Sequence, residues 1–315
     1  MTIALAFDTG LAALVVGVAI WTITAREAFA AVVGFVAYGL LLALVWVRLA
    51  APDVALTEAA IGSGVTGGLL LGASTRLRRT ETPAAGEKPG ATLRLAAALL
   101  CTLVSTGLAA ILLLLPEPAP TLAPQAAANL AATGLGNPVT AVLMAYRAID
   151  TLLETVVLLL ALVGVWSLAP DHVWGGFPGP RHHADPDGVL TFIAQLLVPV
   201  GILVGIHIFW VGSVAPGGEF QGATILAAMW ILAMMAGLVD APPVSRCWLR
   251  LLLVAGPAVF LAIGLAGLAM AGAFLGYPVD YAKLLIVTIE VPVTLSIAAT
   301  LAVLVAGPPE RAPRR

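Results

Sequence analysis

Charged residues are scarce in this chain of 315 residues. Asp, Glu, Lys and Arg together make up only 10% of it, whereas hydrophobic residues make up 61% and the mean hydropathy is +1.05. Soluble domains carry about 25% charged residues, so the composition excludes a soluble enzyme and is typical of a protein whose solvent is lipid. The net charge of −2 is too balanced to favour nucleic acid as a partner.

Cysteine is also rare. Cys101 and Cys247 lie far apart, and no further Cys or His stands near them at the spacing of metal ligands. Zinc and iron–sulfur sites need clustered thiolates or imidazoles, and a disulfide framework needs more cysteines than two. We therefore expect no bound metal, no cofactor and no catalytic residue.

Long apolar runs fill most of the sequence. A bilayer core of about 30 Å requires roughly 20 apolar residues per helix, so we expect an all-α, polytopic transmembrane bundle of about nine spans. No basic segment precedes the first span and no small-residue cleavage site follows it, so we interpret it as a retained helix and not as a signal peptide. The expected spans are Ile3–Thr22, Ala28–Leu49, Pro52–Ser74, Leu93–Leu115, Val139–Leu168, Leu190–Trp210, Phe220–Val239, Leu251–Leu275 and Tyr281–Ala306.

The basic residues predict the orientation. Lys and Arg concentrate in cytoplasmic loops, and a chain with its N-terminus outside and its C-terminus in the cytoplasm places twelve of the 15 basic residues there. We therefore expect a multi-pass protein of a bacterial inner membrane in this orientation. Arg48 is expected to reach outward to water or to pair with Asp53. The twelve residues are Arg26, Arg76, Arg78, Arg79, Lys88, Arg94, Arg181, Arg246, Arg250, Arg311, Arg314 and Arg315.

Two polar stretches divide the chain into three modules. Residues 80–91 are rich in Pro, Gly and charge, and residues 171–187 carry three of the four His residues. They separate a three-helix module (1–79), a two-helix module (92–170) and a four-helix module (188–308). A basic tail (309–315) follows the last module.

Ionisable residues inside spans are expensive and therefore point to partners, cavities or ion paths. Glu58 lies about two turns into the third span, before a run of small residues that lets helices approach closely. It is either a buried carboxylate of a tight bundle or an acid that reaches the outer interface.

The fifth span carries a charged cluster. Arg147, Asp150 and Glu154 follow an i, i+3, i+7 spacing, which places them on one face of a helix. One interpretation is a proton relay, in which Arg147 pairs with Asp150 and Glu154 exchanges the proton. The other is a static ion-pair cluster that fixes packing against a partner subunit.

The segment near residues 212–222 interrupts strongly apolar sequence with Pro216 and several Gly residues. Irregular backbone at membrane depth persists only inside protein or beside water, and free amides at the start of the next helix favour anions. Glu219 stands in that first turn, so we expect either an ion site or an ordinary tight loop at the outer surface.

Three single residues complete the candidates for an ion or proton path. His207 lies in the sixth span, where a lone His is usually a hydrogen-bonded core residue. Lys283 and Glu290 lie at i, i+7 on one face of the last span, and Pro292 follows Glu290 closely. A Pro there frees a backbone carbonyl, so Glu290 is a candidate proton site.

Three segments carry a family resemblance across nearly the whole chain. Ala51–Gly62 (APDVALTEAAIG) is similar to the module that the large Mrp antiporter subunit shares with the D subunit of membrane-bound hydrogenases. Asn137–Glu154 (NPVTAVLMAYRAIDTLLE) resembles the module that follows it in those hydrogenases, the E-subunit type. Ala215–Gly222 (APGGEFQG) resembles the MnhB domain of Mrp antiporters. Glu219 departs from that pattern, because the family commonly has Gly there.

The resemblance implies a membrane subunit of a multi-subunit sodium/proton antiporter of the Mrp type, and not an enzyme. The expected partners are other subunits of the antiporter, membrane lipid, and the transported ions Na⁺ and H⁺. Glu58, Arg147, Asp150 and Glu154 carry over from the family motifs as ion-route residues. Two alternatives stay open: the ion-translocating module of a respiratory, hydrogenase-like complex, and a purely structural antiporter subunit.

Overall fold

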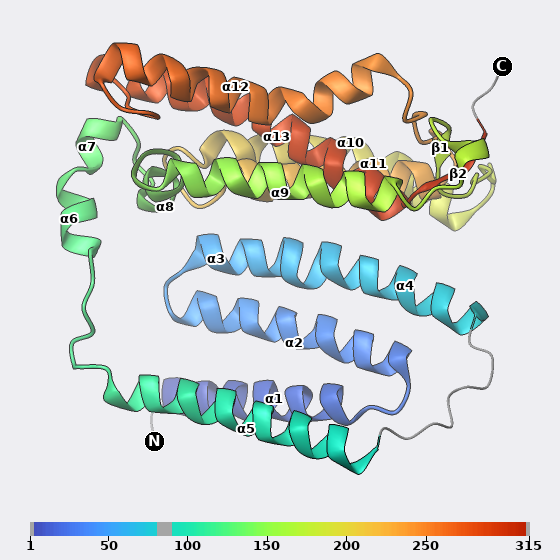
Figure 1. The fold of residues 1–315 in the computed structure, drawn as a ribbon, viewed down its shortest axis with the longest axis horizontal. Coiled ribbons are helices and arrows are strands. Elements are labelled where there is room, and N and C mark those ends of the chain that lie inside the picture. Colours follow the sequence, from blue (N-terminus) through green and yellow to red (C-terminus); the bar gives the residue numbers. More distant parts are fainter. Residues whose placement is uncertain (1–2, 81–89, 313–315) are drawn as a thin grey trace.

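The computed structural model describes residues 3–80 and 90–312, with side chains of 76–80 left aside. The described chain is almost entirely helical, and eight of its helices are long and apolar enough to cross a membrane. A ninth apolar helix, α11 (Glu219–Met235), has 17 residues. These helices run side by side (Figure 1), which confirms the predicted all-α polytopic bundle. The predicted linker 80–91 falls largely outside the described residues.

The first layer of the bundle is formed by α1 (Ile3–Thr24), α2 (Ala28–Arg48) and a third, composite helix. That helix begins at Pro52 as α3 (Pro52–Thr57), passes through the π-helix η1 (Glu58–Val65) and continues as α4 (Thr66–Thr80). At the end of α2, Arg48 forms a bidentate pair with Asp8 of α1, at 2.7 and 3.0 Å. The alternative that Arg48 pairs with Asp53 is therefore wrong, because Asp53 is buried in another network.

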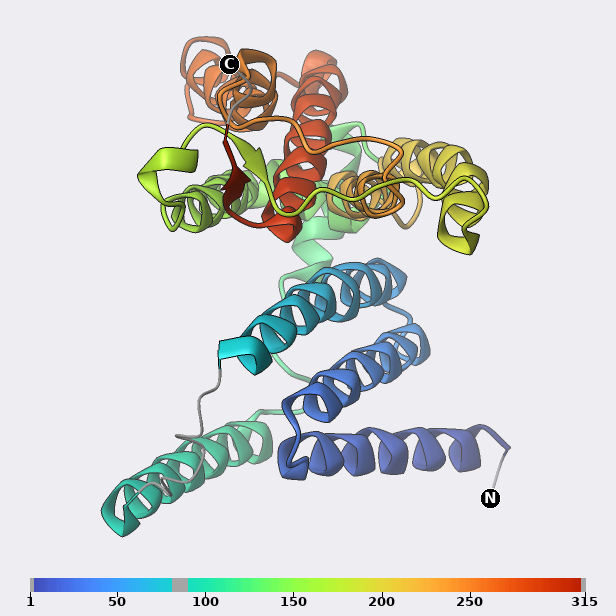
Figure 2. The ribbon, with the colours of Figure 1, turned by 90° about the vertical axis from the view of Figure 1, so that its right-hand side faces the viewer.

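The next helix, α5 (Ala91–Leu114), has no buried residue among those described. It lies on the far side of the first layer from α9 (Ala148–Trp166), and although it overlaps α1 in Figure 1, Figure 2 shows it to one side of α1. The connection carries α6 (Ala123–Ala128) and α7 (Leu130–Thr133) to α8 (Pro138–Ala141), which continues into the π-helix η3 (Val142–Tyr146). The two helices expected for residues 92–170 thus do not pack against each other.

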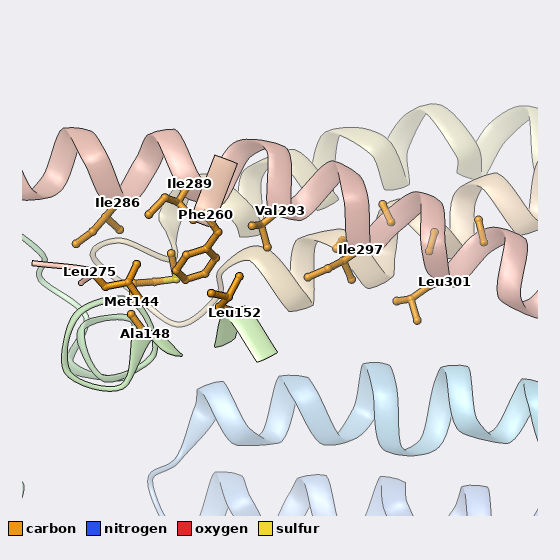
Figure 3. Packing of buried hydrophobic residues seen from close by; sticks show 14 of the residues in the cluster. Met144, Ala148, Leu152, Phe260, Leu275, Ile286, Ile289, Val293, Ile297 and Leu301 are labelled. Atoms are coloured by element: carbon orange, nitrogen blue, oxygen red, sulfur yellow. The ribbon is translucent and has the colours of Figure 1, made fainter. Parts of the chain in front are cut away.

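The second layer is built around α13 (Ala282–Ala306), which η5 (Val279–Tyr281) precedes. α13 packs against α9, α11 and α12 (Cys247–Ala271), whereas α10 (Val189–Val211) packs against α11. Figure 3 shows the core under α13, where Met144, Leu152 and Phe260 meet Ile289 and Val293. Burial of each of these side chains stabilises the fold by about 1.5–3 kcal/mol. Because α13 packs against three other helices, it lies at the centre of the second layer.

The C-terminus is fastened to the loops at its own end of the bundle. After η4 (Asp171–Val173), strand β1 (Phe177–Pro178) pairs antiparallel with β2 (Pro309–Arg311). Arg311 donates to both carboxylate oxygens of Asp240 at 2.7 and 3.0 Å, and to the carbonyl oxygen of Gly179. The hydrogen bonds from Arg311 hold the pKa of Asp240 below its usual range. We call this the C-terminal clasp. Arg314 and Arg315 of the expected basic tail lie outside the described residues.

Candidate ion path of buried carboxylates

The interruption predicted near residues 212–222 is present. α10 ends at Val211, and Gly212–Gly218 form a loop that folds back until the Gly218 N–H donates to the Ile208 carbonyl at 3.1 Å. Gly217 and Gly218 are buried and have φ of +148° and +134°, a conformation that favours glycine. The loop is therefore folded into the protein, and it delivers the chain to the first residue of α11, Glu219.

Glu219 and Glu290 are buried acids on neighbouring helices. Glu219 is 2% exposed and Glu290 on α13 is 4% exposed. The two carboxyl groups interact electrostatically, and Oε1 of Glu219 has no hydrogen-bond partner within the described part of the chain. The alternative of an ordinary surface loop for Glu219 does not fit this burial.

A cavity of about 360 Å³ gives Glu290 a route out of the core. Lys283 and Glu290 line it from α13, and Ser213 and Val214 line it from the loop. Lys283 is exposed. The predicted common face of Lys283 and Glu290 is therefore present, at the end of the bundle where α13 begins.

A second cavity, of about 560 Å³, lies beside Phe220, the residue that follows Glu219. Asp150 and Glu154 of α9 line it, together with Phe220 of α11 and Ile61 of η1. Glu154 also interacts electrostatically with Glu219. Three carboxyl groups from α9, α11 and α13 thus follow one another between two cavities. We call Glu154, Glu219 and Glu290 the carboxylate row.

The carboxylate row has the chemistry of a proton path. Glu219 and Glu290 are buried, whereas Glu154 is exposed where it lines its cavity. Two buried carboxyl groups that interact can hold one proton between them, and a carboxyl group at a cavity can exchange a proton with a neighbour or with water. Among the residues that the structure describes, no cluster of three His, Cys, Asp or Glu side chains could hold a metal ion. The row is therefore suited to move protons.

Arg147 does not continue the helix that was expected for Val139–Leu168. Its φ of −131° and ψ of 34° break the helix, so that α9 begins at Ala148. The Arg147 N–H donates to the Val142 carbonyl, in the register of a π-helix. Arg147 still pairs with Asp150, at 2.6 Å, with 71% and 40% of the two side chains exposed. Glu154 faces the cavity and forms no part of this ion pair.

Two other candidates lie apart from the carboxylate row. Glu58 begins η1 and is half-buried, with its side chain against Gly39 and Gly62. His207 is exposed on α10 and lines neither cavity. The expectation that His207 is a hydrogen-bonded core residue is wrong, because it faces outward from the bundle.

Two polar residues near the row were missing from the sequence-based candidates. The hydroxyl of Tyr277 is buried without a hydrogen-bond partner in the described chain, and Tyr277 interacts electrostatically with Glu290. Asp53 was expected only as an alternative partner of Arg48, but it is 6% exposed and contacts the Gly212–Gly218 loop. Neither role could be predicted from neighbouring residues, because Glu290, which interacts with Tyr277, and Gly217, which binds Asp53, lie farther along the chain.

Family models match two of the three modules. Residues 13–79 match the MbhD family, which is the D-type subunit of MBH. Residues 189–307 match the MnhB family, a domain related to the MnhB subunit of the Na+/H+ antiporter. The chain joins an MbhD domain to an MnhB domain. Both resemblances drawn from the sequence are thus confirmed. The E-subunit resemblance of residues 92–170 stays a prediction.

Relatives support the same arrangement. An uncharacterised protein of Methanocaldococcus jannaschii, MJ1307, is 29% identical over 190 residues, which cover 53% of this chain and 72% of the relative. The Mrp complex from Dietzia sp. DQ12-45-1b contains a chain of the same fold, with a TM-score of 0.74 and 24% identity. That match covers 97% of this chain but only 35% of the Mrp chain.

A second solved structure shares the fold over a smaller region. It is the membrane-bound sulfane sulfur reductase, an archaeal respiratory membrane complex, and the match has a TM-score of 0.54 and 24% identity. It covers 68% of this chain and 98% of the matched chain. The fold of the MbhD and MnhB domains therefore occurs in subunits of large membrane complexes.

Proposed function

We propose that this chain is a membrane subunit of a multi-subunit antiporter that exchanges a monovalent cation, Na⁺, for protons. Within it, the carboxylate row of Glu154, Glu219 and Glu290 carries the proton. The observation that supports this most is the burial of Glu219 between two other acids, with one carboxylate oxygen unpaired. The MnhB match supports the antiporter class.

The energetics favour a functional role for the row over static packing. A charge near the bilayer centre costs about 2.5–3.5 kcal/mol on insertion scales. A static acid inside the bundle would recover such a cost through an ion pair with a basic side chain. The charged side chains that act on Glu219 in the described chain are the acids Glu154 and Glu290, so packing does not explain why an acid is retained there.

The two cavities provide the ends of the proposed path. The cavity beside Glu290 lies where α13 begins, which is the outer side in the orientation that the basic residues predict. The cavity beside Glu154 opens between α9 and the MbhD domain. Protons would pass from Lys283 and Glu290 through Glu219 to Glu154. Asp150, held by Arg147, lines the same cavity as Glu154.

Partner subunits are part of the proposal, because long apolar faces are left uncovered by the residues that the structure describes. The residues of α5 are exposed, and Leu11 is the sole buried residue of the described α1. Other antiporter subunits and lipid would cover these helices in the membrane. We therefore expect the chain to act as part of a complex and not by itself.

The test is sodium-driven proton flux in everted vesicles that contain the whole complex. Glu219→Gln keeps the shape of the side chain but removes titration, and we expect flux to fall by at least about tenfold. The matched control is Glu117→Gln in the exposed segment that follows α5, which should keep wild-type flux. Subunit levels are checked by blotting. Wild-type flux in Glu219→Gln, with normal assembly, would contradict the proposal and favour a structural subunit.

A second candidate function is that of an ion-translocating module in a redox-linked complex. The fold match to a respiratory membrane complex supports it. In that case electron transfer, and not a sodium gradient, would drive proton movement through the same carboxylate row. Flux that requires an electron donor and ignores the sodium gradient would identify this function.

A further inference from the structure

Asp53 connects the MbhD domain to distant parts of the chain. It lies in the first turn of α3 and is 6% exposed. Its Oδ1 accepts a hydrogen bond from the backbone N–H of Gly217 at 3.0 Å and another from Nδ2 of Asn137 at 3.2 Å. One buried carboxylate of the first domain thus holds the Gly-rich loop of the MnhB domain and the segment before α8.

α3 also holds the first turn of α11. Thr57 stands one turn after Asp53, and Nε2 of Gln221 donates to its Oγ1 at 2.9 Å and to the backbone oxygen of Asp53 at 3.4 Å. Gly217 and Gln221 flank Glu219, two residues before it and two residues after it. Both flanks of the central acid of the carboxylate row are therefore bound to α3.

The loop has a second set of anchors before and within α8. Asn137 donates from Nδ2 to the Ala215 carbonyl at 3.0 Å, and Thr140 donates to the Gly212 carbonyl at 2.6 Å. The backbone N–H groups of residues 136 and 137 donate to the Ser213 carbonyl. These oxygens already have protein donors, so the junction is a closed hydrogen-bond network and not an open cation site.

The buried loop needs such a network. Backbone amides at membrane depth have no water to bind, and Gly217 and Gly218 adopt φ values that no helix or strand can satisfy. Without Asp53, the Gly217 N–H would lose its acceptor in a buried site. The segment before Glu219 would then be free to adopt other conformations, since glycine restricts the backbone least.

We propose that Asp53 is a positioning residue that fixes the Gly212–Gly218 loop and thereby holds Glu219 between Glu154 and Glu290. The proposal rests on the proton path described above, since it explains how that path keeps its middle member in place. It makes proton transfer in the MnhB domain dependent on the MbhD domain.

The experiment follows the loop and the transport separately. The assembled complex is used, in a background in which both exposed cysteines, Cys101 and Cys247, are changed to Ser. Ser213→Cys then places a half-buried thiol in the loop, and its labelling rate with a permeant maleimide reports how closed the loop is. In Asp53→Ala we expect labelling to become severalfold faster and sodium-driven proton flux to fall.

A conservative replacement tests positioning more directly than a deletion. Asp53→Asn removes the charge but keeps a side-chain oxygen that can accept from the Gly217 N–H and from Nδ2 of Asn137. Asn137→Asp, in contrast, removes the donor to Asp53 and to the Ala215 carbonyl and sets two carboxyl groups together. We expect Asp53→Asn to label as slowly as wild type and to transport, and Asn137→Asp to label fast and to transport poorly.

The outcomes separate this proposal from the proton path. Unchanged labelling in Asp53→Ala would show that Asp53 does not hold the loop, and would overturn the proposal. Faster labelling with full flux would also overturn it, provided that Glu219→Gln abolishes flux. If Glu219→Gln keeps full flux too, the failure belongs to the proton path and not to the anchoring of the loop.

Discussion

Replacing Glu219 by Met separates an acid kept for transport from an acid kept for structure. Met has a similar length and volume but no polar group, and it adapts well to apolar surroundings. Glu219 is 2% exposed and lies in the first turn of α11, beside Phe220 and the core under α13. If the acid serves proton transfer, Glu219→Met should abolish flux and at the same time stabilise the protein.

The expected gain follows from the hydrogen bonds of Glu219. Its Oε1 has no partner in the described chain, and leaving a buried polar group unsatisfied costs about 1–3 kcal/mol. Buried ionic groups can often be replaced by well-packed apolar residues of similar volume without loss of stability, as replacements of buried ion pairs show. We therefore expect Glu219→Met to raise the free energy of unfolding by about 1–3 kcal/mol.

The assay is thermal unfolding of the purified complex in one detergent, followed by intrinsic fluorescence, together with sodium-driven flux in vesicles. Glu219→Gln is the control, because it removes titration but keeps a polar group in the same place. Gln should lose flux without the gain in stability. A Glu219→Met complex that unfolds at a lower temperature than wild type would refute the reasoning and show that the acid stabilises the fold.

Three further predictions concern other parts of the bundle. Gly222→Val should disrupt the contact between α10 and α11 and reduce the level of folded chain on blots, because even a Cβ at Gly222 would lie 2.8 Å from the Gly205 carbonyl oxygen. Arg311→Ala should open the C-terminal clasp and speed proteolysis of the tail, at a cost of about 0.5–1 kcal/mol for this partly exposed pair. Since Arg311 lowers the pKa of Asp240, the clasp should hold near neutral pH and be lost only as the pH falls through that lowered pKa. Cys247 should react with an impermeant maleimide in everted vesicles but not in intact cells, and the reverse pattern would overturn the predicted orientation.

The spans themselves were predictable because the bilayer imposes their length. The second span was expected at Ala28–Leu49 and is found at Ala28–Arg48, and the last was expected at Tyr281–Ala306 and is found at Ala282–Ala306. The Gly- and Pro-rich interruption before Glu219 was predictable for a similar reason, since those residues cannot continue a helix. Hydropathy and helix breakers are local signals, and they were sufficient here.

The break at Arg147 had no such signal. Residues 139–168 contain no central Gly or Pro pair, so their apolar pattern predicts one long helix. In the structure the chain enters a π-helical turn, and Thr151 donates from its hydroxyl to the Leu143 carbonyl that the break sets free. Whether a backbone N–H binds the carbonyl of an α-helix or of a π-helix depends on the packing around it. The spacing of apolar residues in the sequence does not predict which of the two forms.

The role of Asp53 could not be predicted from the sequence, because its hydrogen-bond partners are far away along the chain. Its two carboxylate hydrogen bonds reach residues 84 and 164 positions away. A Pro-Asp pair at the start of an apolar run predicts a helix N-terminus near the membrane surface, and that interpretation accounts for the local residues equally well. Only the packing of α3 against α11 shows that the carboxylate faces a buried backbone amide.

At Glu219, the departure from the family pattern and the structure together indicate a role for the acid. It stands where the resembled family commonly has Gly, and a Gly would be required if the backbone had a positive φ. In the described chain, the residues other than Gly with positive φ are Ala50 and Leu275, so the backbone at Glu219 accepts any residue. The backbone at this position therefore does not require glycine. An acid there does not form all the hydrogen bonds that its carboxylate could accept in the described chain, because its Oε1 has no partner. An acid that the backbone does not need and that packing does not stabilise is best explained by its neighbours, Glu154 and Glu290, with which it can exchange a proton.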